Sequence, residues 1–300
     1  MTVRKFEEWT IAYRRKNGDG TLLPDDRETP FLTVKNTWRY WCADPHLFDR
    51  EGRTYLFAEL YDRVLRRGVI GCCEITDRGC TPWKVVLKMP WHLSYPHVFS
   101  CGDKIYMIPE SYVGEEIALY EAVSFPEKWV KAKTLKSDYV AVDSTVFTCG
   151  GRTWLQTLQL LDGHEYFRLF AVENGELAER ALQIAADDPN VRPGGKLFRY
   201  RGKLLRPAQD CTESYGCALN FYEVTAVSCE KYEEHLLTKV RPEELRSDFP
   251  KPPQGIHTYN CSEKYEVIDL KSYETDRLFY VMRPIWFIWR RVKRAFGKEK

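Results

Sequence analysis

Short hydrophobic runs that each end in an aromatic residue recur along the chain and predict a repeated β-structure. The clearest runs end at Phe48, Phe99, Phe147 and Phe198, and a weaker one ends at Tyr259. Successive anchors are about 50 residues apart, which is the length of one β-propeller blade. We therefore predict an all-β fold, a five-bladed β-propeller. The competing fold is a two-sheet sandwich, and the regular return of the same run argues against it.

Each repeat continues from its aromatic anchor into a hairpin and a third strand. A glycine turn such as Gly52 or Gly102 precedes an apolar run such as residues 104–110. Glycine supplies the positive φ that tight hairpins need. Third strands are expected over residues 69–75, 117–122, 166–173 and 218–224. We expect a strand from residues 7–40 to complete the last blade, because ring closure removes exposed sheet edges.

Helical patterning is thin except at the C-terminal end. Residues 241–249 could form one or two turns, whereas residues 283–300 show an amphipathic helical pattern. One face of that helix would carry Ile285, Ile288, Trp289, Val292 and Phe296, with Arg290, Arg291, Lys293 and Arg294 mostly off it. The apolar run before it is too short to span a bilayer. We therefore predict a propeller domain over residues 1–282 and a basic amphipathic tail over residues 283–300.

Composition and charge narrow the function classes. The chain has 300 residues, 44% of them hydrophobic, and a net charge of +2. That charge does not indicate a polyanion binder, and no nucleic-acid partner is expected because the basic cluster is confined to the tail. The 10 cysteines include no CxxC pair, and Glu7 and Glu8 lie where a secretory signal would be apolar. We therefore expect reduced thiols, no zinc site and a cytoplasmic location.

The axial strand of each blade carries unexpected polar residues. Four positions before the anchors stand Asp44, Tyr95, Asp143, Gly194 and Gly255, and two positions before them stand His46, His97, Thr145, Lys196 and His257. Side chains alternate along a strand, so we expect both positions to share one face towards the axis. A purely structural strand would favour Val, Ile or Thr there.

The second strand of each blade ends in a similar way. Eleven residues after the anchors stand Glu59, Glu110, Leu158, Gln209 and Leu270. Arg206 and Asp210 lie close to Gln209 in the chain, and Arg192 lies two residues before Gly194. Carboxylates, histidines and arginines that converge at one mouth suit a sugar, for which they can act as general base, general acid or hydrogen-bond partners. The alternative is that polar axial residues only hold water.

Six ordered motifs resemble a known family. They are residues 43–45, 93–99, 106–111, 143–147, 192–195 and 206–210. Together they resemble the propeller domain at the N-terminus of plant glucosamine inositolphosphorylceramide transferases. Similar domains occur in bacterial proteins of surface-polysaccharide loci, some of them fused to formyltransferases. The resemblance implies a fold like that of five-bladed arabinanase- and xylosidase-type glycosidases.

The resemblance also implies roles for two aspartates. In those glycosidases an Asp that opens the first blade is the base, and an Asp at the start of a central blade tunes its pKa and position. Asp44 and Asp143 match these residues by motif. The general acid of the glycosidases is a Glu in the following blade, where this chain has Arg192 and no carboxylate. Hydrolysis would need a relocated acid such as Glu110 or Asp210, whereas glycosyl transfer needs one base and cations for a phosphate-bearing leaving group.

We therefore expect glycosyl transfer in cell-surface polysaccharide or glycolipid biosynthesis. Asp44 would be the base, with Asp143 and Glu110 as supporting carboxylates. The expected substrate-binding residues are His46, Tyr95, His97, Arg192, Arg206, Gln209, Asp210 and His257. The alternatives are a non-catalytic glycan-binding propeller and a glycoside hydrolase with a relocated general acid.

The expected partner is a sugar or a lipid-linked glycan. No cofactor is expected. A metal on the axis, held by His46, His97 and His257, is a weaker alternative to histidines that are satisfied by hydrogen bonds.

Residues 283–300 are expected to bring the protein to the inner face of an anionic membrane, with packing of this helix on the propeller as the alternative. Deleting them should lower co-sedimentation with liposomes that contain anionic lipid, because each lost cation near the surface contributes about 1 kcal/mol. Sedimentation equal to that of the full chain would contradict membrane contact.

Overall fold

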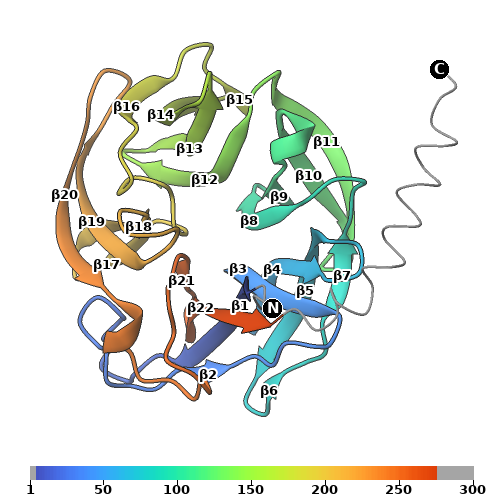
Figure 1. The fold of residues 1–300 in the computed structure, drawn as a ribbon. Helices are drawn as coiled ribbons and strands as arrows, with labels where there is room; N and C mark the ends of the chain where they lie inside the picture. The colour runs from blue at the N-terminus through green and yellow to red at the C-terminus, as the bar shows by residue number, and fades with distance from the viewer. Residues whose placement is uncertain (1–4, 276–300) are drawn as a thin grey trace, which may run out of the picture.

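Five antiparallel sheets surround one central axis in the computed structural model, which describes residues 5–275 (Figure 1). The predicted five-bladed propeller is confirmed. The predicted helix over residues 283–300 and the end of the predicted 1–282 domain lie outside the described residues.

Each of the first four blades runs outward from the axis in chain order, and the fifth begins in the same way. The axial strands are β3 (Tyr40–Arg50), β8 (Ser94–Cys101), β12 (Ala141–Cys149), β17 (Phe198–Tyr200) and β21 (Tyr259–Cys261). The second strands are β4 (Arg53–Asp62), β9 (Lys104–Glu110), β13 (Arg152–Leu161), β18 (Lys203–Asp210) and β22 (Tyr265–Thr275). The third strands of the first four blades are β5 (Arg67–Thr76), β10 (Glu116–Ser124), β14 (His164–Glu173) and β19 (Ala218–Val227). The outer strands of these blades are β6 (Gly79–Cys80), β7 (Lys84–Leu87), β11 (Lys128–Ser137), β15 (Glu176–Leu177), β16 (Leu182–Ala186) and β20 (Tyr232–Val240).

The N-terminal segment completes the fifth blade, as the sequence predicted. Strand β1 (Lys5–Arg15) pairs with β22 along its whole length, and β2 (Leu32–Thr33) forms the short outer edge. The buried Arg14 fixes this closure, because its Nε lies 2.8 Å from Glu266 Oε2 on β22. Removing one partner of a buried ion pair costs about 3–5 kcal/mol, so this contact favours the closed ring.

Apolar side chains fill the spaces between neighbouring blades. Phe57 of the first blade packs with Met107 and Trp129 of the second. Phe221 of the fourth blade packs on Tyr259 of the fifth, with ring centroids 5.2 Å apart. Because the hydrophobic cores lie between the blades, the axis is left for polar side chains.

Helix is nearly absent from the part of the chain that the structure describes. It is limited to two single 3-10 turns, Tyr112–Gly114 and Pro242–Glu244. The second is the turn predicted within residues 241–249. Within residues 5–275 no helix has the length and apolar character needed to cross a membrane.

A close approach of blades four and five can be tested at Gly195. Its φ is +142°, and a Cβ there would lie 1.9 Å from the carbonyl oxygen of Tyr259. Gly195→Ala should therefore lower the free energy of unfolding by roughly 2–4 kcal/mol, measured by chemical denaturation. The matched control is Gly202→Ala, where φ is +79° and no heavy atom lies within 4 Å. It should lose only about 1 kcal/mol, and equal losses would contradict the steric account.

Candidate functional site

A β-bulge interrupts the axial strand at the same place in three blades. In the first blade Ala43 pairs with Glu59 and His46 pairs with Phe57, so two residues face one. The same shift occurs between Ser94 and His97 and between Val142 and Thr145. The first bulge residue has a left-handed φ each time, 51° at Asp44, 42° at Tyr95 and 53° at Asp143. Such a conformation is costly for residues other than glycine, so the surrounding fold must hold these three residues in place.

The bulges overturn one prediction from the sequence. In the three bulged blades the residues four and two positions before the anchor do not share a face, because an extra residue breaks the strict alternation along the strand. Asp44 and Asp143 line a cavity at the end where the axial strands begin. His97 and Lys196 line a separate cavity at the end where these strands finish.

The first cavity is about 250 Å³ in volume and is rich in acidic and aromatic side chains. We call it the carboxylate pocket. Its lining includes the carboxylates of Glu7, Asp44, Glu59, Glu110 and Asp143, the aromatic rings of Trp9, Trp41, Tyr61 and Tyr215, and the side chains of His92, Arg192 and His257. The pocket thus joins residues from the beginning, middle and end of the chain.

Asp44 is held from two sides inside this pocket. Its Oδ2 accepts a hydrogen bond from the backbone N–H of Tyr95 at 3.2 Å, and its Oδ1 accepts one from Thr258 Oγ1 at 3.1 Å. Burial raises the pKa of Asp44 from 3.8 to about 6, although the nearby His257 opposes this rise. Asp44 therefore titrates close to neutral pH, where a general base is most effective.

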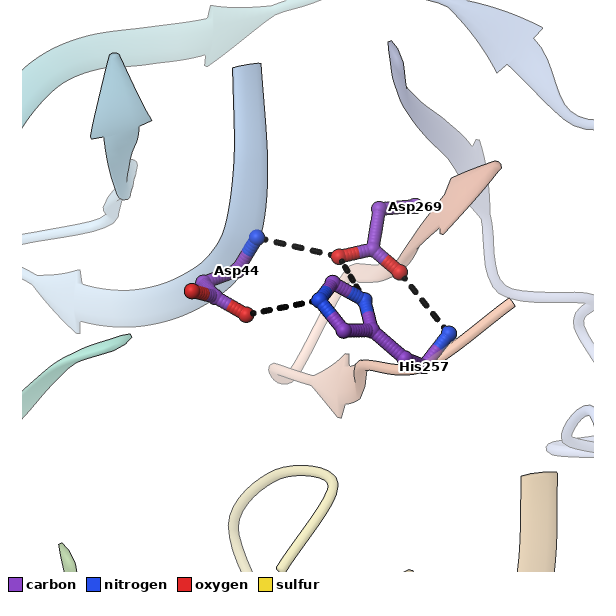
Figure 2. Close-up of side chains that lie close together, drawn as sticks. All are labelled: Asp44, His257 and Asp269. Carbon is purple, nitrogen blue, oxygen red and sulfur yellow. Dashed lines mark hydrogen bonds and ion pairs between the residues drawn. The ribbon is translucent and has the colours of Figure 1, made fainter. Parts of the chain in front are cut away.

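His257 bridges Asp44 and a second buried aspartate, Asp269 (Figure 2). Its Nε2 lies 3.4 Å from Asp44 Oδ1, and its Nδ1 lies 2.7 Å from Asp269 Oδ2. Asp269 also accepts hydrogen bonds from the backbone N–H groups of Asp44 and His257. Trp9 stacks on the imidazole with ring centroids 3.8 Å apart. Burial lowers the pKa of His257, but Asp269 and Asp44 outweigh it and the net pKa is raised.

The structure separates the histidines that were considered for an axial metal. His257 lines the carboxylate pocket, whereas His97 lines the opposite cavity. A different group, Asp44, His257 and Asp269, offers three ligand atoms within 4.8 Å of one another. In the described part of the chain both ring nitrogens of His257 already face carboxylate oxygens, so the arrangement is that of a cationic imidazole between two anions.

Asp143 is held by the residues that the sequence placed near it. Arg192 Nε lies 2.5 Å from Asp143 Oδ2, and Gln209 Nε2 donates to the same oxygen at 3.0 Å. Arg192 Nη2 lies 3.8 Å from Glu110 Oε2, and its guanidinium lies over the ring of Tyr215 at 5.1 Å. Arg192 therefore joins two of the carboxylates that the sequence predicted for the site.

Glu110 and Glu59 are two carboxyl groups of the pocket whose surroundings favour the protonated, neutral form. Burial, followed by the charge of Asp143, raises the pKa of Glu110 well above its ordinary value, although Arg192 opposes this. Burial, followed by the charges of Asp44 and Glu110, does the same for Glu59. These shifts favour the protonated form of both carboxyl groups.

His92 contacts Glu59 in a defined tautomer. Its Nδ1 accepts a hydrogen bond from the backbone N–H of Gly68 at 2.9 Å, so in the neutral ring the proton lies on Nε2. That nitrogen is 3.2 Å from Glu59 Oε1. Burial lowers the pKa of His92, which keeps the ring neutral.

The remaining predicted site residues lie outside the pocket. Arg206 is fully buried beside Phe167 and Tyr222 and pairs with Glu234. Asp210 pairs with Lys239 and accepts a bond from Thr212 Oγ1. Tyr95, His46 and His97 also do not line the pocket, although the Tyr95 backbone holds Asp44 and His46 Nδ1 lies 3.3 Å from the Asp44 carbonyl oxygen.

Sequence reasoning missed Asp269 and Trp9. The fifth hairpin is longer, because Tyr259 pairs with Ile268 nine residues on, whereas Phe48 pairs with Tyr55 seven residues on. The position equivalent to Glu59 in this blade is therefore Ser272, and Asp269, ten residues after its anchor, belongs to no position of the repeat count. Trp9 lies on β1 and reaches the site only because β1 closes the ring. The spacing of the repeats carries no information about that closure.

A solved structure with the same fold is the catalytic domain of the GH62 α-L-arabinofuranosidase of Coprinopsis cinerea. It matches with a TM-score of 0.59 over 87% of this chain and 97% of that chain, at 11% sequence identity. At this identity the likeness concerns the fold. The expected relation to the propellers of arabinose- and xylose-cleaving glycosidases is confirmed at that level.

Sequence comparison gives a narrower relation. The glucosamine inositolphosphorylceramide transferase 1 of Oryza sativa subsp. indica is 32% identical over 241 residues, which are 73% of this chain and 31% of that protein. Its Arabidopsis thaliana counterpart is 32% identical over 209 residues, 64% of this chain and 26% of that protein. The chain thus spans less than a third of these relatives. Residues 32–282 match the family described as glucosamine inositolphosphorylceramide transferase 1, N-terminal. The chain therefore belongs to the family of this N-terminal propeller domain.

Proposed function

We propose that the carboxylate pocket binds a sugar and that Asp44 acts there as the general base of a glycosyl transfer. The observation that carries this proposal is a buried carboxylate with a pKa of about 6 that lines a pocket of aromatic and acidic side chains. Sugars present apolar faces and hydroxyl edges. Aromatic surfaces with a few well-placed polar groups are suited to both.

The aromatic part of the pocket has two surfaces. Trp41 and Tyr61 stack on each other with ring centroids 4.6 Å apart. Trp9 and Tyr215 both contact the His257 ring, the first in a stacked and the second in an edge-on arrangement. A sugar ring between these surfaces would bring its hydroxyl groups to the carboxylates.

The proposed step is displacement at the anomeric carbon. Asp44 accepts the proton of an acceptor hydroxyl as that oxygen bonds to the anomeric carbon, and the bond to the leaving group breaks with its electron pair. The cationic His257 stabilises Asp44 in its ionised form before the proton moves. Asp143 serves as the anchor of Arg192, because the guanidinium and the Gln209 amide already occupy its Oδ2.

The leaving group would be received by Arg192 and Glu110. Arg192 uses its Nε on Asp143, which leaves its other N–H groups for a phosphate-bearing group. Glu110, with its raised pKa, can donate a hydrogen bond to the departing oxygen. Arg206 does not take part, because it pairs with Glu234 in the interior of the fourth blade.

The same neutral carboxyls support a second candidate, hydrolysis with a relocated general acid. Glu110 and Glu59 lie in one cavity with Asp44, and their raised pKa values are those that a general acid needs. Non-catalytic glycan binding is the remaining alternative, since the glycosidases' glutamate is replaced by the paired Arg192.

The plant relatives support a lipid-linked substrate, since they are transferases named for glucosamine and inositolphosphorylceramide. We extend to this chain the proposal of a lipid-linked or cell-surface glycan as substrate. A cytoplasmic location at the inner face of a membrane is proposed with it, and the basic residues 283–300 support this.

Asp44→Asn tests the catalytic role. Turnover should fall at least about a hundredfold, because a general base contributes roughly 10²–10⁴ to the rate. Sugar affinity should stay within about threefold, since the amide keeps the shape of the carboxylate and its oxygen can still accept the hydrogen bond from Thr258. Turnover would be measured as nucleoside diphosphate release from a panel of nucleotide sugars with glycan acceptors, and as release of free sugar from glycosides. Binding would be measured by calorimetry.

Asp143→Asn and Asp187→Asn complete the experiment. Asp143→Asn should lower turnover by releasing Arg192, whereas Asp187→Asn, an exposed carboxylate of the third blade, should leave both readouts unchanged. Turnover that survives in both site variants while binding falls would exclude the enzyme and favour glycan binding alone. Hydrolysis would be favoured if the wild-type protein releases free sugar from glycosides but no nucleoside diphosphate, and if the site variants lose that sugar release.

A further inference from the structure

A second cavity lies at the end of the axis away from the carboxylate pocket. It has a volume of about 310 Å³, and its walls include the aromatic anchors of the first four repeats, Phe48, Phe99, Phe147 and Phe198. We call it the anchor cavity. Its polar side chains are the buried His97, the partly buried Lys196 and the exposed Thr148 and Arg199. The glycosyl-transfer step described above uses none of them.

His97 presents an unsatisfied buried donor. The residue is 2% exposed, and its ring stacks on Phe99 with centroids 5.4 Å apart. Its Nε2 accepts a hydrogen bond from the backbone N–H of Val146 at 3.0 Å, so the neutral ring carries its proton on Nδ1. Within the described residues that Nδ1 has no hydrogen-bond partner. A buried donor without an acceptor is costly, which points to a ligand atom at this place.

Lys196 brings a positive charge to the same cavity. Its Nζ donates to the carbonyl oxygen of Leu47 at 2.5 Å and lies 5.9 Å from the Phe48 ring centroid. Among residues 5–275, the Lys196 ammonium forms no ion pair with a carboxylate, and its hydrogen bond goes to a backbone carbonyl oxygen. One of its three donors is therefore satisfied by a neutral group. Burial outweighs the effect of Asp49, which lies near enough to raise the pKa of Lys196.

The neighbouring histidines do not add charge. Burial, followed by the charge of Lys196, lowers the pKa values of both His46 and His97, to about 3 for His46. Burial also lowers the pKa of Lys196, to about 8, so the ammonium keeps its proton at neutral pH. The polar end of the cavity thus offers one positive charge and one neutral N–H donor.

We propose that the anchor cavity binds the carboxylate of an organic ligand whose apolar part packs against the four phenylalanine rings. One ammonium balances one negative charge, which favours a carboxylate over a doubly charged phosphate. Lys196 and the Nδ1–H of His97 supply two donors for its two oxygens, and a charge-assisted bond is stronger than a neutral one. Arg199 is exposed at the edge of the cavity, where water screens its charge. This site is independent of the proposed glycosyl transfer, since it lies at the other end of the axis.

The test is calorimetric titration with benzoate and with benzyl alcohol, a neutral compound of similar shape. Benzoate should bind the wild-type protein saturably and at least about tenfold more tightly than benzyl alcohol, which corresponds to roughly 1.4 kcal/mol. Lys196→Met keeps the length of the side chain and should weaken benzoate binding about tenfold or more. Lys231→Met, at an exposed lysine of the fourth blade, is the matched control and should leave it unchanged. Equal binding of the two compounds, no benzoate binding, or an unchanged affinity in Lys196→Met would overturn the proposal.

A second measurement uses the wild-type protein alone and stays decisive if Lys196→Met fails to fold. Nitrogen-15 spectra of the histidine rings should show His97 protonated at Nδ1, and that resonance should shift on addition of benzoate. His164, which is exposed on the third blade and pairs with Asp187, should not shift. If the His97 resonance does not shift at saturating benzoate, only water occupies the cavity and the proposal is wrong.

Discussion

The pairing of β1 with β22 is the interaction on which the rest of the structure depends. Without β1 the fifth blade would end at an open edge of β22, and open edges invite association with other chains. Here eleven residues of β1 pair with β22. The buried contact between Arg14 and Glu266 fixes their register. Because the closing strand belongs to the N-terminus, the fifth blade is the one place where both ends of the described chain meet.

That junction is also where the site is built. Asp44 comes from the first blade, His257 and Asp269 come from the fifth, and Trp9 comes from the closing strand. Crowding carboxylates into a buried pocket raises the pKa values of Asp44, Glu59 and Glu110, and the folded state must bear that cost. A left-handed φ at Asp44 adds backbone strain in the same place. Strain and shifted pKa values that coincide in one cavity are typical of a functional site.

The sequence was sufficient for the blade count, because aromatic anchors at a fixed period reflect the packing of every blade on its neighbour. The sequence pattern also predicted one shared site for Asp44, Asp143, Glu110, Arg192, Gln209 and His257. In the structure these residues lie in or directly behind the pocket. It failed where local geometry departs from a regular strand. Bulges in three axial strands broke the regular alternation, so His97 lines a different cavity from Asp44, and Asp269 lies at no position that the repeat count selects. Arg206 and Asp210 were predicted at the site because they lie close to Gln209 in the sequence. In the structure each instead pairs with a charged residue on β20.

The central claim is that ring closure creates a buried acid–base group at Asp44. The most direct measurement is a carbon-13 NMR titration of the aspartate carboxyl groups, with Asp44 assigned by its absence from the Asp44→Asn spectrum. The account predicts that Asp44 titrates at a pKa of about 6, above the ordinary value of 3.8. A titration at or below 3.8 would mean that the carboxylate is well solvated or only structurally paired, and would contradict the account.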